Sequence, residues 1–145
     1  MNMNMNSMMF ISMFIIQYVF MSYIMTNSVE NITNSIGKIY MCTIMGLFMV
    51  VAGVLMQHKF NIKQFIVFGG LLVGCIYLYK IQYGIDAKEY LKEMVEHHSM
   101  ALLTSKAIIE KTKDNDVLKL AQRIIQTQEK EINEMRGLIN RPDKL

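Results

Sequence analysis

Three long apolar runs in the first half of the chain constrain its fold more than any other feature. They cover residues 8–25, 39–56 and 65–81, and few polar side chains interrupt them. An α-helix needs about 20 residues to cross the hydrocarbon core of a bilayer, because each residue adds only about 1.5 Å. We therefore predict three transmembrane helices, and a lipid bilayer as the first partner of the protein.

The distribution of charge divides the chain into two parts. The residues before Asp86 include only five charged side chains, which are Glu30, Lys38, Lys59, Lys63 and Lys80. From Asp86 onward there are eleven acidic and eleven basic residues, so this part is neutral. The division predicts a membrane anchor at residues 1–84 and a separate C-terminal domain at residues 85–145. A neutral domain without a basic stripe is poorly suited to nucleic acid, which we do not expect as a partner.

The lysines of the short loops give a prediction of orientation. Lys59 and Lys63 lie between the second and third runs, whereas the loop between the first and second runs has no basic residue. The positive-inside rule then places the N-terminus in the cytoplasm and the C-terminal domain outside it. Lys80 and Lys88, which follow the third run, favour the opposite orientation.

Three smaller features of the anchor lead to further expectations. The first run lacks the basic leader and cleavage site of a signal peptide, so we expect it to be retained as a span. Gly69, Gly70 and Gly74 are predicted to allow close packing between spans, because small residues let helix backbones approach. The sequence Asn31-Ile32-Thr33 matches a glycosylation sequon in the first loop.

The C-terminal domain has the 3.6-residue period of two amphipathic helices. Residues 111–116 contain turn formers and an Asp that can cap the second helix. Two long helices with a short connection pack antiparallel, which predicts a helical hairpin. The inner face predicted for the first helix consists of Ala87, Tyr90, Leu91, Met94, His97, His98, Ala101, Leu102, Ser105, Ile108 and Ile109. That predicted for the second consists of Val117, Leu118, Ala121, Ile124, Ile125, Gln128, Ile132, Met135 and Ile139.

The hairpin register predicts one layer that contains both imidazoles and thioethers. A turn centred near residues 114–115 places His97 and His98 level with residues 131–132 of the second helix, so that the layer comprises Met94, His97, His98, Gln128 and Met135. Thioether and imidazole ligands suit Cu(I), and Glu131 is suited to accept a hydrogen bond from a ligating imidazole. In the alternative interpretation, the histidines hydrogen-bond Gln128 and Glu131 inside a bundle, and the methionines only fill space.

Two segments of the hairpin resemble a known family. Residues 94–101 (MVEHHSMA) and 120–135 (LAQRIIQTQEKEINEM) are similar to the ferritin-like domain-of-unknown-function family numbered 305. The chain differs from the family pattern at Glu96, where many members have Pro, and at Thr104, where many have Met. The resemblance implies half of a ferritin-like four-helix bundle. It also implies a copper-binding role outside the cytoplasm for Met94, His97, His98 and Met135. The hairpin register adds Gln128 and Glu131 as the supporting residues that we expect around those ligands.

The remaining sequence patterns favour binding over catalysis. The Glu-x-x-His motif of di-iron bundles is absent, as are the motifs of common nucleophilic enzymes, so we expect neither a di-iron site nor an enzyme. A hairpin of this size buries little apolar surface alone, which predicts a homodimer or other homo-oligomer. We therefore expect a membrane-tethered extracytoplasmic protein that sequesters or hands off copper. The alternative is a structural or interaction protein whose hairpin oligomerises and whose histidines are core residues.

Overall fold

The computed structural model describes residues 5–57 and 60–141, within which every regular element is helical. The predicted all-α class is therefore confirmed. Contacts divide the chain into two compact units. The first unit contains the described residues of Met1–Met21 together with Ile36–Gly84, and the second contains those of Ser22–Ser35 together with Ile85–Leu145. The sequence alone assigns residues 22–35 to the membrane anchor, whereas in the structure they pack in the same unit as the C-terminal residues.

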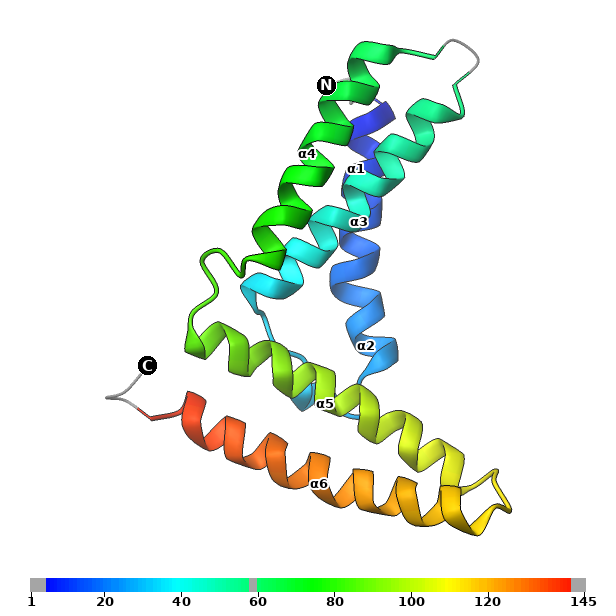
Figure 1. Cartoon of the computed structure of the whole chain (residues 1–145), viewed down its shortest axis with the longest axis vertical. Helices are drawn as coiled ribbons and strands as arrows, with labels where there is room; N and C mark the ends of the chain where they lie inside the picture. The colour runs from blue at the N-terminus through cyan, green and yellow to red at the C-terminus, as the bar shows by residue number, and fades with distance from the viewer. Residues whose placement is uncertain (1–4, 58–59, 142–145) are drawn as a thin grey trace. The chain divides into compact units, whose positions relative to one another are not determined.

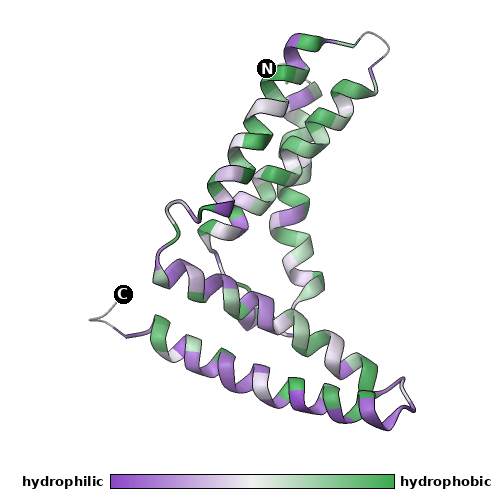
Figure 2. Cartoon of the chain, viewed as in Figure 1, coloured by the Kyte–Doolittle hydropathy of each residue, from purple (hydrophilic) through white to green (hydrophobic). Residues whose placement is uncertain are grey.

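Three helical segments are long and apolar enough to cross a membrane, as predicted. They are Met5–Met25, Ile36–Leu55 and Ile62–Lys80, and each begins three residues before the corresponding apolar run. Figure 2 shows that hydrophobic residues dominate all three segments. His58 and Lys59 of the loop between the second and third segments lie outside the described residues.

The first segment changes its helical type along its length. Its regular part is followed by a π-helical stretch at Ile16–Met21, and the two compact units meet in the chain directly after this stretch. The other two segments are continuous α-helices. In the labels of Figure 1, the α-helices are α1 (Met5–Ile15), α2 (Ser22–Met25), α3 (Ile36–Leu55) and α4 (Ile62–Lys80).

Helix α3 packs against both α1 and α4 within the first unit (Figure 1). Its side chains Cys42, Val50 and Val54 are almost completely buried. A Cβ atom added at Gly46 would lie 2.8 Å from the ring of Phe10 on α1 and 3.2 Å from the Phe10 carbonyl oxygen. The absence of a side chain at Gly46 therefore permits the close approach of α1 and α3.

The predicted close packing at the glycines of α4 is not observed. A Cβ atom added at Gly69, Gly70 or Gly74 would meet nothing within 4 Å among the described residues. The contact with α3 lies on a different face of α4. That face includes Leu72 and Phe68, which belong to the apolar cluster shared with α3.

A substitution at Gly46 tests the α1–α3 contact. Gly46→Leu should destabilise the protein by about 1–3 kcal/mol, because the new side chain overlaps both the ring and the backbone of Phe10. Thermal unfolding of the detergent-solubilised protein, followed by circular dichroism, measures the effect. Gly70→Leu is the matched control, and it should unfold as the wild type does. Equal effects of the two substitutions would contradict the packing described here.

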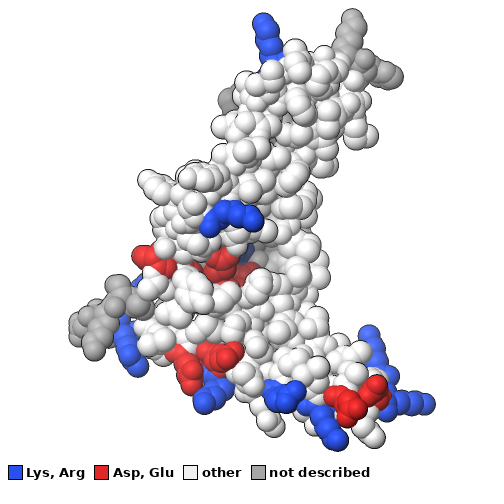
Figure 3. All heavy atoms as spheres, in the orientation of Figure 1, with Lys and Arg blue, Asp and Glu red and all other residues white. Residues whose placement is uncertain are grey.

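The second unit contains two long helices, α5 (Ala87–Ile109) and α6 (Asn115–Ile139). Figure 3 shows charged side chains spread over these helices, in contrast to the nearly uncharged surface of the apolar helices. Both helices begin at an aspartate cap. Asp86 accepts a hydrogen bond from the Glu89 amide, and Asp114 accepts from the amides of Asp116 and Val117. The predicted Asp cap of the second helix is thus confirmed at Asp114.

Helices α5 and α6 pack side by side along their length (Figure 1). Lys106 near the end of α5 pairs with Glu129 of α6 at 3.0 Å, and Leu91 near the start of α5 joins the same apolar cluster as Ile139 near the end of α6. The two helices therefore run in opposite directions. The cluster consists of Val95, Leu102, Ile132 and Met135, with Leu91, Met94, Ile125 and Ile139 packed around it.

The buried face of α5 differs from the predicted inner face. Val95 and Ser99 are 1% and 0% exposed, although the helical period does not place them on that face. Tyr90 and Ile108, which it does place there, are 52% and 40% exposed. The reason is that α5 has a second neighbour, which covers Ser99. This neighbour is the segment 26–35, which we call the clasp.

The clasp joins the first and second apolar segments and contains a short 3₁₀ turn at Val29–Asn31. Several of its polar side chains are buried, including Asn31 at 6% and Ser35 at 1% exposure. The Asn31 side chain is hydrogen-bonded to Ser99 and Arg136. This burial argues against use of the Asn31-Ile32-Thr33 sequon, because a glycosylated asparagine must be exposed at the surface.

Candidate functional site

His98 and Glu131 lie together in the middle of the α5–α6 pair. His98 Nδ1 is 3.2 Å from Glu131 Oε2, which agrees with the register expected from the position of the turn. The Nδ1 atom is buried and makes no hydrogen bond to any described residue, because the carboxylate lies out of line with the ring N–H. A small rotation of the imidazole would align the two groups. The pair is therefore close to, but not in, the geometry in which a carboxylate orients a ligating histidine.

Gln128 is the second polar group in this layer with an unused atom. Its Oε1 is buried and has no hydrogen-bond partner among the described residues. Gln128 precedes Glu131 by three residues, so both side chains lie on the same side of α6. Buried polar atoms without partners are uncommon in proteins and call for an explanation, such as a bound ion or water.

The two predicted thioether ligands belong to the apolar cluster between the helices. Met135 is 8% exposed and is one of the core residues of this cluster. Met94 is partly buried and packs against the cluster from α5. The structure thus brings the two methionines into the same cluster, as the register predicts, and surrounds them with aliphatic side chains.

His97 occupies a different environment from its neighbour. It is exposed, whereas the side chain of His98 retains 23% of its accessible surface. Adjacent residues on a helix are about 100° apart, so the two imidazoles cannot share one narrow face. Among the predicted ligands, His98, Met94 and Met135 lie at the α5–α6 interface and His97 lies at its outer edge.

No group of three or more His, Cys, Asp or Glu side chains within residues 5–57 and 60–141 is arranged to hold a metal ion. The two cysteines are free thiols in the apolar helices, with Cys42 buried and Cys75 partly buried.

Comparisons with known proteins address the α5–α6 segment and the whole chain. Residues 86–144 match the family described as "Domain of unknown function (DUF305)". The Uncharacterized protein L153 of Acanthamoeba polyphaga mimivirus is 34% identical over 143 residues, which cover 97% of this chain and 94% of that protein. The chain belongs to the DUF305 family. The resemblance predicted from the sequence is thereby confirmed. No solved structure matches the chain.

The clasp lies outside the segment that matches DUF305, yet it makes a network of hydrogen bonds with that segment. Ser99 Oγ accepts hydrogen bonds from the Asn27 amide at 2.9 Å and from Asn31 Nδ2 at 3.0 Å. Arg136 Nη2 of α6 donates to the Glu30 carbonyl at 2.9 Å and to Asn31 Oδ1 at 2.7 Å. Asn31 therefore connects α5 to α6 through its side-chain amide.

A second set of contacts holds the other half of the clasp on α5. Thr33 Oγ1 donates to the Lys92 carbonyl at 2.6 Å, and the Thr33 amide donates to Glu96 Oε2 at 3.2 Å. Glu96 stands where the resemblance noted from the sequence leads us to expect Pro. A proline has no carboxylate, so Glu96 supplies an acceptor that a proline could not offer the clasp.

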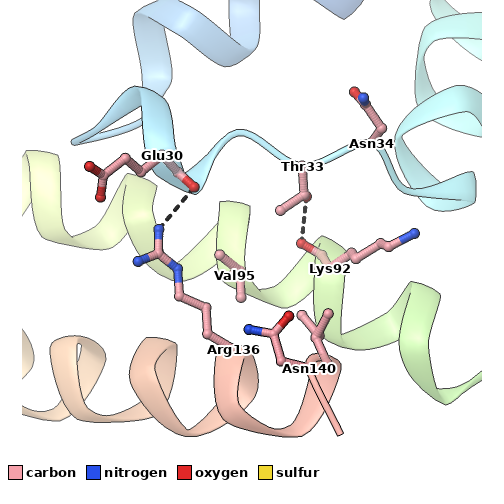
Figure 4. Close-up of a pocket in the computed structure, with 8 residues that line it drawn as sticks. Glu30, Thr33, Asn34, Lys92, Val95, Arg136 and Asn140 are labelled. Carbon is pink, nitrogen blue, oxygen red and sulfur yellow. Dashed lines mark hydrogen bonds between the residues drawn. The ribbon is translucent and has the colours of Figure 1, made fainter. Parts of the chain in front are cut away.

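A cavity of about 410 Å³ lies between the clasp and the two helices. Figure 4 shows Arg136 extending from α6 past Val95 toward the Glu30 carbonyl. The two cationic side chains that line the cavity already have partners. Arg136 binds the clasp, and Lys92 Nζ lies 2.6 Å from Glu89 Oε1. We assign the cavity no binding role.

Ser99, Arg136 and Asn31 are the residues that sequence reasoning missed. A helical period identifies which residues share a face, but it does not indicate that a loop 68 to 72 residues earlier in the chain covers that face. One signal was available in the sequence, because residues 26–35 are rich in Asn, Ser and Thr. Such residues often bond to distant backbone and side-chain groups when they lie in loops.

Replacement of Ser99 tests the clasp network. Ser99→Ala should destabilise the protein by about 1–3 kcal/mol, because it leaves the Asn27 amide and the Asn31 side-chain amide without their acceptor. Denaturant unfolding in detergent measures the change. Thr104→Ala is the matched control, since Thr104 is exposed and bonds only to carbonyls of its own helix, and its effect should stay within about 0.5 kcal/mol. A Ser99→Ala variant as stable as wild type would refute the network.

Proposed function

We propose that this DUF305 protein is a membrane-anchored metal-binding protein that sequesters or hands off copper without catalytic turnover. The ligands would be His98 of α5 and the thioethers of Met94 and Met135, with His97 at the outer edge of the site. Glu131 would orient the His98 ring, and Gln128 would offer its unused carbonyl oxygen to the same layer.

The observation that carries the proposal is the position of the His98 ring. Its buried Nδ1 lies 3.2 Å from Glu131 Oε2, so a slight rotation would let Nδ1–H donate to the carboxylate. The second ring nitrogen, Nε2, would then serve as the metal ligand, as in the carboxylate–histidine–metal arrangement found at many sites. The same pairing fixes the tautomer of the histidine and increases the basicity of its ligating nitrogen.

The donor set favours Cu(I) over harder ions. Thioether sulfur is a soft ligand that binds Cu(I) well, whereas Zn²⁺ sites are built from Cys, His and carboxylate groups. The described residues contain no cluster of three such groups, but two methionines share the apolar cluster between the helices that carry His98 and Glu131. An apolar environment also excludes water and the hard oxygen ligands that would compete with sulfur.

An extracytoplasmic location of the DUF305 domain is part of the proposal. Lys63 lies in the first turn of α4, next to the loop that joins α3 and α4, and a basic residue there favours a cytoplasmic position for that loop. With three crossings, the loop between the first two segments and the residues after α4 lie on the same side of the membrane. The packing of the clasp in one unit with α5 and α6 agrees with this arrangement.

A second candidate function is assembly into a homodimer, in which two α5–α6 pairs form a ferritin-like four-helix bundle. A groove of about 250 Å³ opens between the helices near their connection, bordered by Ile108, Val117 and Leu120, which are 38–46% exposed. A second copy is the occupant that we propose, because the clasp covers another face of α5 and the DUF305 segment has no net charge to repel its copy. The two functions are compatible.

Copper affinity of the full-length protein tests the leading proposal. Glu131→Gln should weaken Cu(I) binding about 10–100-fold, because the imidazole loses the carboxylate that orients it, and His98→Ala should weaken it further. Competition with a chromogenic Cu(I) chelator in detergent solution measures the affinity.

Glu134→Gln is the control for this measurement, since Glu134 is an exposed carboxylate on the same helix. Its affinity should equal that of the wild type. The proposal fails if the wild-type protein takes up no Cu(I), or if all three variants bind as the wild type does.

A charged substitution in the groove tests the second candidate. Leu120→Asp should convert a dimer to a monomer, because two carboxylates would be buried at the contact. Light scattering of the purified protein gives the mass. Lys119→Asp, at an adjacent exposed position outside the groove, should leave the dimer intact. A monomeric wild-type protein would rule out this assembly.

A further inference from the structure

The clasp and the proposed metal ligands use the same two helices at consecutive positions. On α5, Ser99 holds the clasp and directly follows His98. On α6, Arg136 holds the clasp and directly follows Met135. A backbone shift of either helix that moves one set therefore also moves the other, because a helix behaves as a nearly rigid rod over one residue.

Metal binding would require the ligand side chains to rearrange. Met135 is 8% exposed and packs with Val95, Leu102 and Ile132, so its sulfur is engaged in the apolar cluster. Convergence of this sulfur and the His98 ring on one ion calls for repacking, and helix shifts in such transitions are typically about 1–2 Å.

A shift of this size is enough to break the clasp contacts. The Arg136 hydrogen bonds to Asn31 Oδ1 and to the Glu30 carbonyl are 2.7 and 2.9 Å long. Lengthening either by about 1 Å takes it beyond the distance at which a hydrogen bond is effective. Asn31 also bonds to Ser99, so loss of the Arg136 contacts weakens the attachment of the clasp to both helices.

We propose that metal binding between α5 and α6 releases the clasp, and that the clasp thereby couples the metal site to the first two membrane segments. The clasp is continuous with α2 at one end and with α3 at the other, and α2 also contacts α5 within the second unit. The ends of α2 and α3 that adjoin the clasp are therefore held differently when the clasp is bound and when it is released. This inference rests on the proposed metal-binding function.

Two consequences follow from thermodynamic linkage. Suppose that metal binding shifts the clasp equilibrium toward release by some factor. A substitution that fully releases the clasp must then raise metal affinity by that same factor. Asn31→Ala is the direct variant, because it removes the contacts to both Ser99 and Arg136. Arg136→Gln, which removes only the α6 contacts, serves as a second variant should Asn31→Ala fail to fold.

Amide hydrogen exchange of the full-length protein in detergent tests the coupling. The reporters are the amides of Asn27 and Thr33, since each donates to a side chain of α5. Saturation with Cu(I) under anaerobic conditions should raise their exchange rates at least about fivefold. Asn31→Ala should raise the rates without metal and increase Cu(I) affinity by a similar factor, whereas Gln122→Ala, at an exposed position on α6, should change neither.

The outcomes separate the coupling from the proposed function. If Cu(I) binds while the Asn27 and Thr33 amides exchange as before, and Asn31→Ala binds with wild-type affinity, the coupling is wrong and the metal-binding function stands. If no Cu(I) binds, both are wrong. Faster exchange together with a matched gain in the affinity of Asn31→Ala supports both.

Discussion

The hydrogen-bond network around Ser99 is the interaction on which the second unit depends. The apolar cluster between α5 and α6 has only four buried members, and a two-helix pair of this size gains little from the hydrophobic effect alone. The clasp adds a third layer that is mainly polar. Its donors are shielded from water, so each lost acceptor would leave a desolvated group without a partner. Hydrogen bonding thus supplements a core that is too small by itself.

Because of the clasp, the membrane anchor is more than a tether for the C-terminal helices. A tether needs only one connection to the domain that it holds, and the residues after α4 already provide that connection. Here a second connection exists, because the segment between α2 and α3 packs on α5 and α6. The relative from Acanthamoeba polyphaga mimivirus aligns over 97% of the chain, so the similarity extends over the apolar segments and the clasp as well as the DUF305 match. The similarity is therefore not confined to the DUF305 segment.

The proposed metal layer combines features that usually occur in separate environments. Met94 and Met135 belong to an aliphatic cluster, whereas His98 and Glu131 lie where that cluster meets the solvent. Soft ligands in an apolar setting suit Cu(I), and a carboxylate at the edge of the layer can hold the imidazole in one orientation. Gln128 contributes a buried carbonyl oxygen without a partner. These residues are the donors on which the proposed copper site depends, and Met94 and Met135 are part of a packed apolar cluster.

The sequence by itself determined the elements of this protein. Apolar length set the three candidate spans, local capping set the start of α6 at Asp114, and the position of the turn set His98 level with Glu131. These features depend on local or nearly local interactions, which short stretches of sequence encode. The tertiary structure alone decided which face of α5 is buried, which glycines lie at a helix contact, and that residues 26–35 belong with α5 and α6. Such features depend on contacts between residues far apart in the chain, such as Asn31 and Arg136, and no periodic pattern records them.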